Sequence, residues 1–178
     1  MKNRIASVII TFALTLSAWA ADVTAKISDV HLCCKNCVTG VEKAVGEVPG
    51  VTAAVDKDAG TVSLTGPDAA TVQKAANALV AAGYFGKSSD ASIKIATDTG
   101  AKGKKVQTLK VEGVHLCCPK CATAVTEALK PVAGVKGNTA TKGAKSFEVT
   151  GDFNDKEVFA ALQKAGLAGT AEIGRAHV

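Results

Sequence analysis

The sequence is poor in the residues that fill large hydrophobic cores. Only 4% of its 178 residues are aromatic, with one Trp and one Tyr, and Met occurs once. Such a composition allows small cores rather than one large core, and the length suits one medium domain or two small ones. Beyond the N-terminal segment, no run is long and apolar enough to cross a membrane. We therefore expect small domains and no membrane span in the mature chain.

The sequence also lacks a strong excess of charge and the common catalytic motifs. The formal net charge is +5, and the densest basic cluster, Lys102, Lys104 and Lys105, has few aromatic neighbours. This pattern is not typical of a nucleic-acid-binding surface. No Ser/His/Asp set, paired carboxylate site, Gly-rich phosphate loop or cofactor fingerprint is recognisable, which disfavours hydrolases and nucleotide-using enzymes. We expect a protein that is not an enzyme and does not bind nucleic acid.

The first twenty residues have the three-part pattern of a secretory signal. Lys2 and Arg4 supply a positive start, Ile5 to Leu16 form an apolar run, and Ala18 to Ala20 provide a small-x-small cleavage site. The apolar run is short for a membrane span, although a retained anchor is the alternative reading. We predict secretion across the inner membrane and a soluble periplasmic chain that begins near Ala21.

Cysteine is absent outside two tight clusters. The clusters are Cys33, Cys34 and Cys37, and Cys117, Cys118 and Cys121. No cysteine remains elsewhere to link distant parts of the fold, and three per cluster cannot all pair internally. Neighbouring cysteines in sequence also form a disulfide only with strain. Clusters of this kind suit a metal ion better than the disulfide framework that six cysteines in an exported protein would otherwise indicate.

An internal repeat divides the chain. Residues 30–37 recur as residues 114–121, and residues 79–83 correspond to residues 162–166. A repeat of this length is a domain rather than a solenoid unit. The segment between the copies has the turn-rich and charged composition of a short flexible linker. The predicted organisation is a signal peptide over 1–20, a first domain over 21–97, a linker over 98–105 and a second domain over 106–178.

The periodicity of apolar residues predicts the same order of elements in both copies. In the first copy, the alternation or helical spacing indicates strands over 23–28, 51–55, 61–64 and 92–96, and helices over 37–48 and 68–83. In the second, the clearest elements are a helix over 121–132, a strand over 145–150 and a helix capped by Asn154 with Glu157. Two helices that must cover one sheet face predict an α+β fold: two tandem ferredoxin-like βαββαβ sandwiches, each a four-stranded antiparallel sheet with two helices on one face.

Each Cys-x-x-Cys lies where a strand ends and a helix begins. The free N–H groups and the positive end of the helix dipole stabilise a thiolate at this position. Thiolates prefer soft ions such as Cu(I), Hg(II), Zn(II) and Cd(II) to Mg(II) or Ca(II), which need oxygen ligands. The two loops therefore predict soft-metal sites at equivalent places in the two copies.

These loops resemble those of the heavy-metal-associated domain family, which includes copper chaperones, the metal-binding domains of copper-transporting ATPases and periplasmic mercury-binding proteins. In that family the loop reads Gly-Met-x-Cys-x-x-Cys, and its two cysteines hold the ion. The resemblance implies ligands at Cys34 and Cys37 and at Cys118 and Cys121, with up to one Cu(I), Hg(II) or Zn(II) ion per domain. It also implies a membrane metal transporter or another thiolate protein as a partner. Ala82 to Tyr84 resemble the end of the family's second helix.

The loops also depart from the family pattern. His31 and Leu32 stand where the family has Gly-Met, and an additional cysteine, Cys33 or Cys117, fills a variable position. Three sulfurs allow trigonal Cu(I) or Hg(II), and His31 or His115 would complete the Cys₃His set suited to tetrahedral Zn(II). The loss of Gly-Met favours tight retention over rapid transfer.

The sequence thus predicts an exported metal-binding protein that acts as a carrier, scavenger or sensor. Two alternatives remain. One is dithiol/disulfide exchange, because Cys-x-x-Cys at a helix start is also the thioredoxin arrangement. The other is a docking module for a membrane transporter or for the second copy, with thiols shared across the interface. Tyr84 and Phe85 are expected to pack in the core or at a sheet edge.

Overall fold

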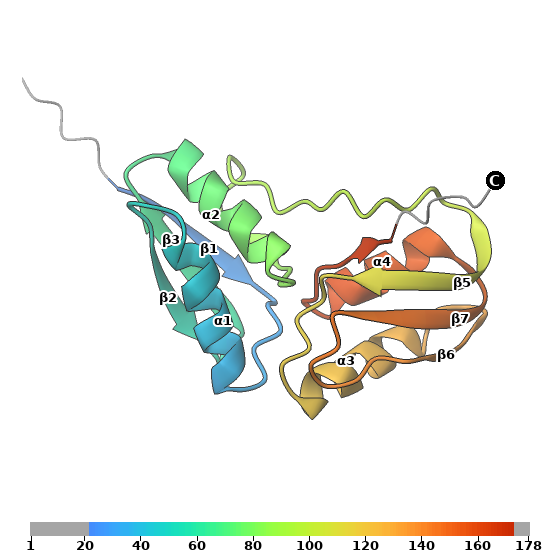
Figure 1. The fold of residues 1–178 in the computed structure, drawn as a ribbon. Coiled ribbons are helices and arrows are strands. Elements are labelled where there is room, and N and C mark those ends of the chain that lie inside the picture. The colour runs from blue at the N-terminus through green and yellow to red at the C-terminus, as the bar shows by residue number, and fades with distance from the viewer. Residues whose placement is uncertain (1–21, 173–178) are drawn as a thin grey trace, which may run out of the picture.

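The two halves of the chain fold into the same α+β unit. The structure, a computed structural model, describes residues 22–172, so the predicted signal peptide lies outside the described residues (Figure 1). The first domain contains β1 (Val23–Ser28), α1 (Lys35–Gly46), β2 (Thr52–Asp56), β3 (Thr61–Gly66), α2 (Ala69–Ala81) and β4 (Lys87–Ser88). The second contains β5 (Lys105–Glu112), α3 (Pro119–Leu129), β6 (Val135–Asn138), β7 (Ser146–Asn154), α4 (Asp155–Lys164) and β8 (Thr170–Ala171).

Each sheet has four antiparallel strands, in the orders β2-β3-β1-β4 and β6-β7-β5-β8. The first and third strands of each domain pair at the centre, so the two helices are crossovers that cover one face. This confirms the predicted α+β class with two ferredoxin-like sandwiches. None of the helices in residues 22–172 has the length and apolar character to cross a membrane.

Small apolar side chains form the core, as the periodicity predicts. Ala25 and Ile27 of β1 are fully buried, and they alternate with exposed Thr24 and Lys26. The cap residues follow expectation: Asp68 accepts a hydrogen bond from the Thr71 amide at the start of α2, and Asn154 accepts one from the Lys156 amide at the start of α4. The capping box predicted at α4 is only half present, because the Asn154 bond reaches Lys156 and the Glu157 side chain makes no return bond among the described residues. Local patterning therefore determines most element positions.

One predicted strand is wrong. Residues 92–96 form no strand, and the last strand of the first domain is β4, which pairs through Ser88 with Ile27 of β1. The apolar alternation there has another cause. Ile93 is buried, and both backbone groups of Lys94 bond to the Gln73 side chain of α2, at 2.8 and 2.7 Å. The segment is hydrogen-bonded to a helix and pairs with no strand in residues 22–172.

The connection between the domains is held by hydrogen bonds over much of its length. It leaves the end of β4, passes α2 and crosses to the start of β5 (Figure 1). The Gln163 side chain donates to the Thr97 hydroxyl (2.8 Å), and the Ala171 amide donates to the Thr99 carbonyl (2.7 Å). Near its end, the carboxylate of Asp155 accepts three backbone N–H groups, from residues 102, 103 and 104, at 2.8 to 3.0 Å. These hydrogen bonds hold the connection in place, whereas its composition predicts a flexible linker.

The two domains contact each other through equivalent segments after α2 and α4. Tyr84 and Leu167 form an antiparallel bridge. On either side, the Phe85 amide donates to the Gly166 carbonyl (3.1 Å), and the Ala168 amide donates to the Gly83 carbonyl (3.0 Å). The contact is thus nearly two-fold symmetric within one chain, as an isologous dimer interface is between two chains.

Two glycines allow this approach. Gly83 has φ +91° and Gly166 has φ +78°, a left-handed backbone that other residues rarely adopt. A Cβ at Gly83 would overlap the backbone of Gly113 and His115, and a Cβ at Gly166 would overlap the backbone of Asp29 and His31. Each domain therefore presses against the strand-to-loop segment of the other.

Candidate metal centre

Each cysteine loop begins a helix in the same way. Cys34 and Cys118 are the N-cap residues of α1 and α3, with extended backbones and without a side-chain cap bond. The carbonyl of each accepts the amide of the last cysteine of its loop, Cys37 (3.0 Å) or Cys121 (3.1 Å). These last cysteines lie in the first turn and are fully buried. The positive ends of two helix dipoles therefore lie at the sulfur atoms.

The two loops meet, so that all six cysteines lie in one cluster. Within the loops, neighbouring sulfurs are 3.7 to 3.8 Å apart. Between the loops, the Sγ of Cys33 lies 3.3 Å from that of Cys118 and 3.4 Å from that of Cys121. The Sγ of Cys117 lies 3.6 Å from that of Cys34 and 3.5 Å from that of Cys37. All six are free thiols.

The spacing of the sulfurs suits metal coordination. A Zn–S bond of about 2.3 Å in a tetrahedral site places neighbouring sulfurs about 3.8 Å apart. Four groups in the described residues bring three ligand atoms within 4.8 Å of one another: His31/Cys33/Cys121, Cys33/Cys34/Cys118, Cys34/Cys37/Cys117 and Cys117/Cys118/Cys121. The donor set is therefore suitable for a soft ion without rearrangement of the backbone.

Both predicted histidines lie beside the sulfurs. The Nε2 atoms of His31 and His115 are buried, and neither has a hydrogen-bond partner among the described residues. Burial lowers the pKa of His31, against the opposing effect of the Cys37 charge, so its ring is neutral at pH 7 and retains a lone pair. A buried imidazole nitrogen without a partner is destabilising, and a metal ion would satisfy it.

Hydrogen bonds between the thiols distribute the protons of the cluster unequally. The nearby Cys121 thiol lowers the pKa of Cys37 to about 2 and, against the effect of burial, His115 and Cys117 also stabilise its thiolate. The charge on Cys37 in turn raises the pKa of Cys121, and burial raises the pKa of Cys33 and of Cys117. One thiolate is thus solvated by its neighbouring thiols, and a bound cation would replace their protons.

Tyr84 supports the cluster from the first domain. Its hydroxyl donates to the carbonyl of Cys37 (2.9 Å), and its ring stacks on His115 of the second domain, with centroids 4.6 Å apart. Gly40 of α1 makes room for both groups, because a Cβ there would meet the Tyr84 hydroxyl and the His115 ring. Tyr84 therefore positions one loop and one histidine together.

Every residue predicted as a ligand lies in this one cluster, across the two domains. Sequence reasoning assigned no site role to the residues that bring the loops together. Tyr84 was expected to pack, although the family resemblance implies a side chain close to the metal loop at this position, and Gly83 and Gly166 were not expected to contact the other domain. The repeated position of the two glycines is visible in the sequence. Their role in contact between the domains depends on how the halves meet, which the sequence pattern does not encode.

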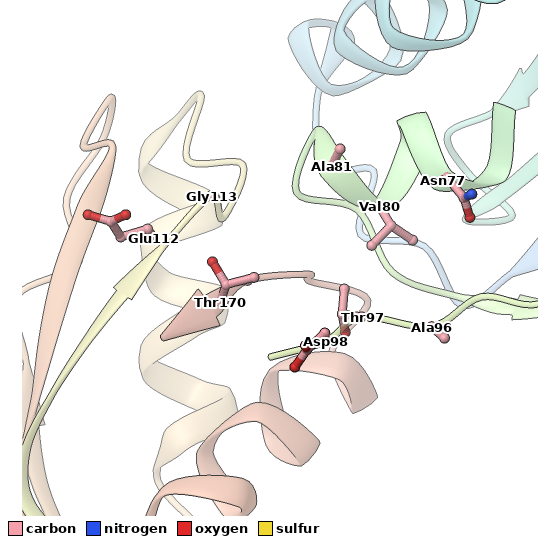
Figure 2. Close-up of a pocket in the computed structure, with 10 residues that line it drawn as sticks. Asn77, Val80, Ala81, Ala96, Thr97, Asp98, Glu112, Gly113 and Thr170 are labelled. Carbon is pink, nitrogen blue, oxygen red and sulfur yellow. The ribbon is translucent and has the colours of Figure 1, made fainter. Parts of the chain in front are cut away.

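A separate hollow of about 270 Å³ lies between α2, the connecting segment and the second sheet (Figure 2). Its walls include Asn77 and Val80 of α2, Asp98 of the connection and Glu112 of β5. Its lining contains neither cysteine nor histidine. This hollow is therefore distinct from the thiolate cluster and lacks soft-metal ligands.

The family comparison agrees with the chemistry of the cluster. The model of the heavy-metal-associated domain matches residues 24–85, which contain the whole first cysteine loop. That segment contributes three of the six cysteines. The domain and the cysteine cluster together support the binding of a heavy-metal ion.

Two solved structures are similar over most of their length. The solution structure of the N-terminal soluble domains of Bacillus subtilis CopA is 18% identical, with a TM-score of 0.31, and the match covers 86% of this chain and 95% of that chain. The crystal structure of the first two RRM domains of yeast poly(U) binding protein (Pub1) is 11% identical, with a TM-score of 0.23, and the match covers 84% and 98%. At these TM-scores neither adds to the assignment. The comparison with curated proteins gives no match.

Proposed function

We propose that this chain is an exported, non-enzymatic protein that binds soft metal ions and holds them as a scavenger or carrier. The observation that supports it most strongly is the convergence of six free cysteine sulfurs, with cross-loop distances of 3.3 to 3.6 Å. So many free thiols in an exported protein require protection, and coordination to a metal provides it.

Thiolate ligands favour Cu(I), Hg(II) and Zn(II) among the ions such a protein meets. A site of three sulfurs suits trigonal Cu(I) or Hg(II), whereas Zn(II) requires a fourth ligand, which His31 or His115 would supply. We propose Cu(I) as the principal ion, with Zn(II) as the competitor that uses the histidines.

Retention suits the site better than rapid transfer. Each loop is faced by the other, so the surface that a transporter or second thiolate protein would contact is already occupied from within the chain. Delivery to a membrane metal transporter would require the two domains to separate. We therefore propose scavenging ahead of delivery, and the signal pattern predicted in the first twenty residues supports a periplasmic location.

The test is metal analysis on protein purified without oxygen from a periplasmic extract. Thiol counting and elemental analysis should find bound metal and no disulfide, and the mass should show a chain that begins near Ala21. Metal-free protein whose cysteines are paired would instead indicate dithiol/disulfide exchange. A variant with all six cysteines replaced by serine is the control, and it should retain no soft metal.

A further inference from the structure

The six sulfurs do not separate into two groups of three, one for each loop. The shortest distances in the cluster join cysteines of different domains: Cys33 to Cys118 (3.3 Å) and Cys33 to Cys121 (3.4 Å). The distances within each loop are longer, at 3.7 to 3.8 Å. Two independent sites would show the opposite order, with each triplet closed on itself and separated from the other.

The candidate ligand groups also overlap. Three of the four groups in the described residues contain cysteines from both domains. Cys33 belongs to two of them, and Cys34 belongs to two as well. An ion in one group therefore shares a sulfur with an ion in the next, which is the geometry of a thiolate bridge. Since one soft ion takes only three or four ligands, six sulfurs exceed the needs of a single ion.

Each histidine also lies against residues of the opposite domain. His31 of the first domain groups with Cys33 of its own loop and Cys121 of the other. His115 of the second domain stacks on Tyr84 of the first. Both imidazoles present a buried Nε2 without a partner among the described residues. Each histidine is therefore held by the interface between the domains.

Backbone contacts between the domains hold the two cysteine loops next to each other. The bridge between Tyr84 and Leu167 and its two flanking hydrogen bonds hold the segments beside the loops together. The His31 amide also donates to the Gly166 carbonyl (3.3 Å). The close approach of the loops is thus supported by backbone contacts outside the cluster.

Building on the proposed function, we infer that the two loops form one polynuclear site, in which at least two Cu(I) ions are bridged by cysteines of both domains. This replaces the expectation of up to one independent ion per domain. Each ion that enters displaces thiol protons, which pass to the solvent. The second ion completes a set of ligands that the first has already ordered, so loading is cooperative.

A double-mutant cycle on Cys33 and Cys118 tests this inference. The full mature chain, Cys33→Ser, Cys118→Ser and the double variant are titrated with Cu(I) against a competing chelator, without oxygen. In a shared site each single change lowers the affinity on the order of tenfold or more, and the double change is little worse than either single change. In independent sites each single change spares one ion completely, and the losses of the double variant are additive.

X-ray absorption on the fully loaded wild-type chain supplies a direct structural readout. A bridged site gives sulfur scattering together with a Cu···Cu distance, and this second feature disappears in Cys33→Ser. Circular dichroism of all four proteins should be the same, because both cysteines are only half-buried. Two bound ions with no Cu···Cu feature and additive losses overturn the shared site but leave the proposed function intact. A wild-type chain that binds neither Cu(I) nor Zn(II) refutes the proposed function itself.

Discussion

The two domains carry equivalent loops on equivalent folds, yet they differ where they face each other. The first pairs a small residue with a large one, Gly40 with Tyr84, whereas the second has Ala124 and Leu167 at the corresponding positions. Only the first half thus supplies a hydroxyl to the loop carbonyl and a ring to the opposite histidine. The candidate ligands are thus duplicated while the residues that support them are not, so the two halves are structurally unequal.

The largest loss of stability is expected from substitution of the two glycines at the nearly symmetric contact between the domains. Gly83→Ala or Gly166→Ala should destabilise the chain by about 3 kcal/mol, from left-handed strain and overlap with the opposite backbone. Denaturant unfolding measures this loss, and amide exchange at Phe85 and Ala168 should become faster. Gly143→Ala is the matched control, since its φ is also positive (+76°) but no atom lies within 4 Å of the added Cβ. An equal loss in Gly143→Ala would show that strain alone, not contact between the domains, explains the result.

The next largest loss of stability is expected from changes to the Gly40 and Tyr84 pair of the first half. Gly40→Ala should cost about 2 kcal/mol, because the methyl group meets the Tyr84 hydroxyl and the His115 ring. Adding Tyr84→Leu reproduces the Ala124/Leu167 pair of the second half, and it should recover part of the loss in thermal unfolding. Gly46→Ala on the same helix has open space and should be neutral or slightly stabilising. Equal destabilisation by both glycine changes would contradict this account.

The second domain alone depends on a buried carboxylate at its last helix. Asp155→Ala should lower its free energy of unfolding by about 2 kcal/mol, because three backbone N–H groups of the connection lose their acceptor. These bonds outweigh burial and hold the pKa of Asp155 below 3.8. The stabilisation is therefore present at neutral pH and declines as the pH falls below 3.8 toward the folded-state pKa.

Denaturant titrations of wild type and Asp155→Ala at pH 7 and at pH 3 check this expectation. The difference between the two proteins should narrow at the lower pH. Asp155→Asn keeps the size of the side chain and should lie between them at pH 7. A difference that does not change with pH would mean that the charge of the carboxylate is not what the connection requires.

The smallest effect concerns one hydrogen bond. Tyr84→Phe keeps the ring stacked on His115 but removes the hydrogen bond to the Cys37 carbonyl. This change should lower the free energy of unfolding by about 1 kcal/mol. The expected readout is a slightly lower midpoint of unfolding with stacking preserved in the aromatic circular dichroism. Unchanged stability would indicate that another donor satisfies the Cys37 carbonyl in solution.

Much of each domain was predictable because short-range patterns determine it. The alternation in β1, the helical spacing from Cys37 to Val45 and the cap at Asp68 all correspond to observed elements. The strand predicted over 92–96 failed for a specific reason: burial of Ile93 against a helix gives the same alternation as burial in a sheet. Sequence periodicity reports which side chains are buried, and it does not identify the element that buries them.

Local spacing and periodicity are enough to predict the candidate ligands, their position at two helix starts and the duplicated fold. The folded structure adds three features: the triplets face one another, cross-domain sulfur pairs are closer than those within a loop, and Tyr84 reaches the opposite histidine. These features depend on packing between residues about 80 positions apart, which involves left-handed glycines and a backbone bridge rather than a repeating pattern. A short-range code cannot specify such contacts, since they exist only once both domains have folded and met.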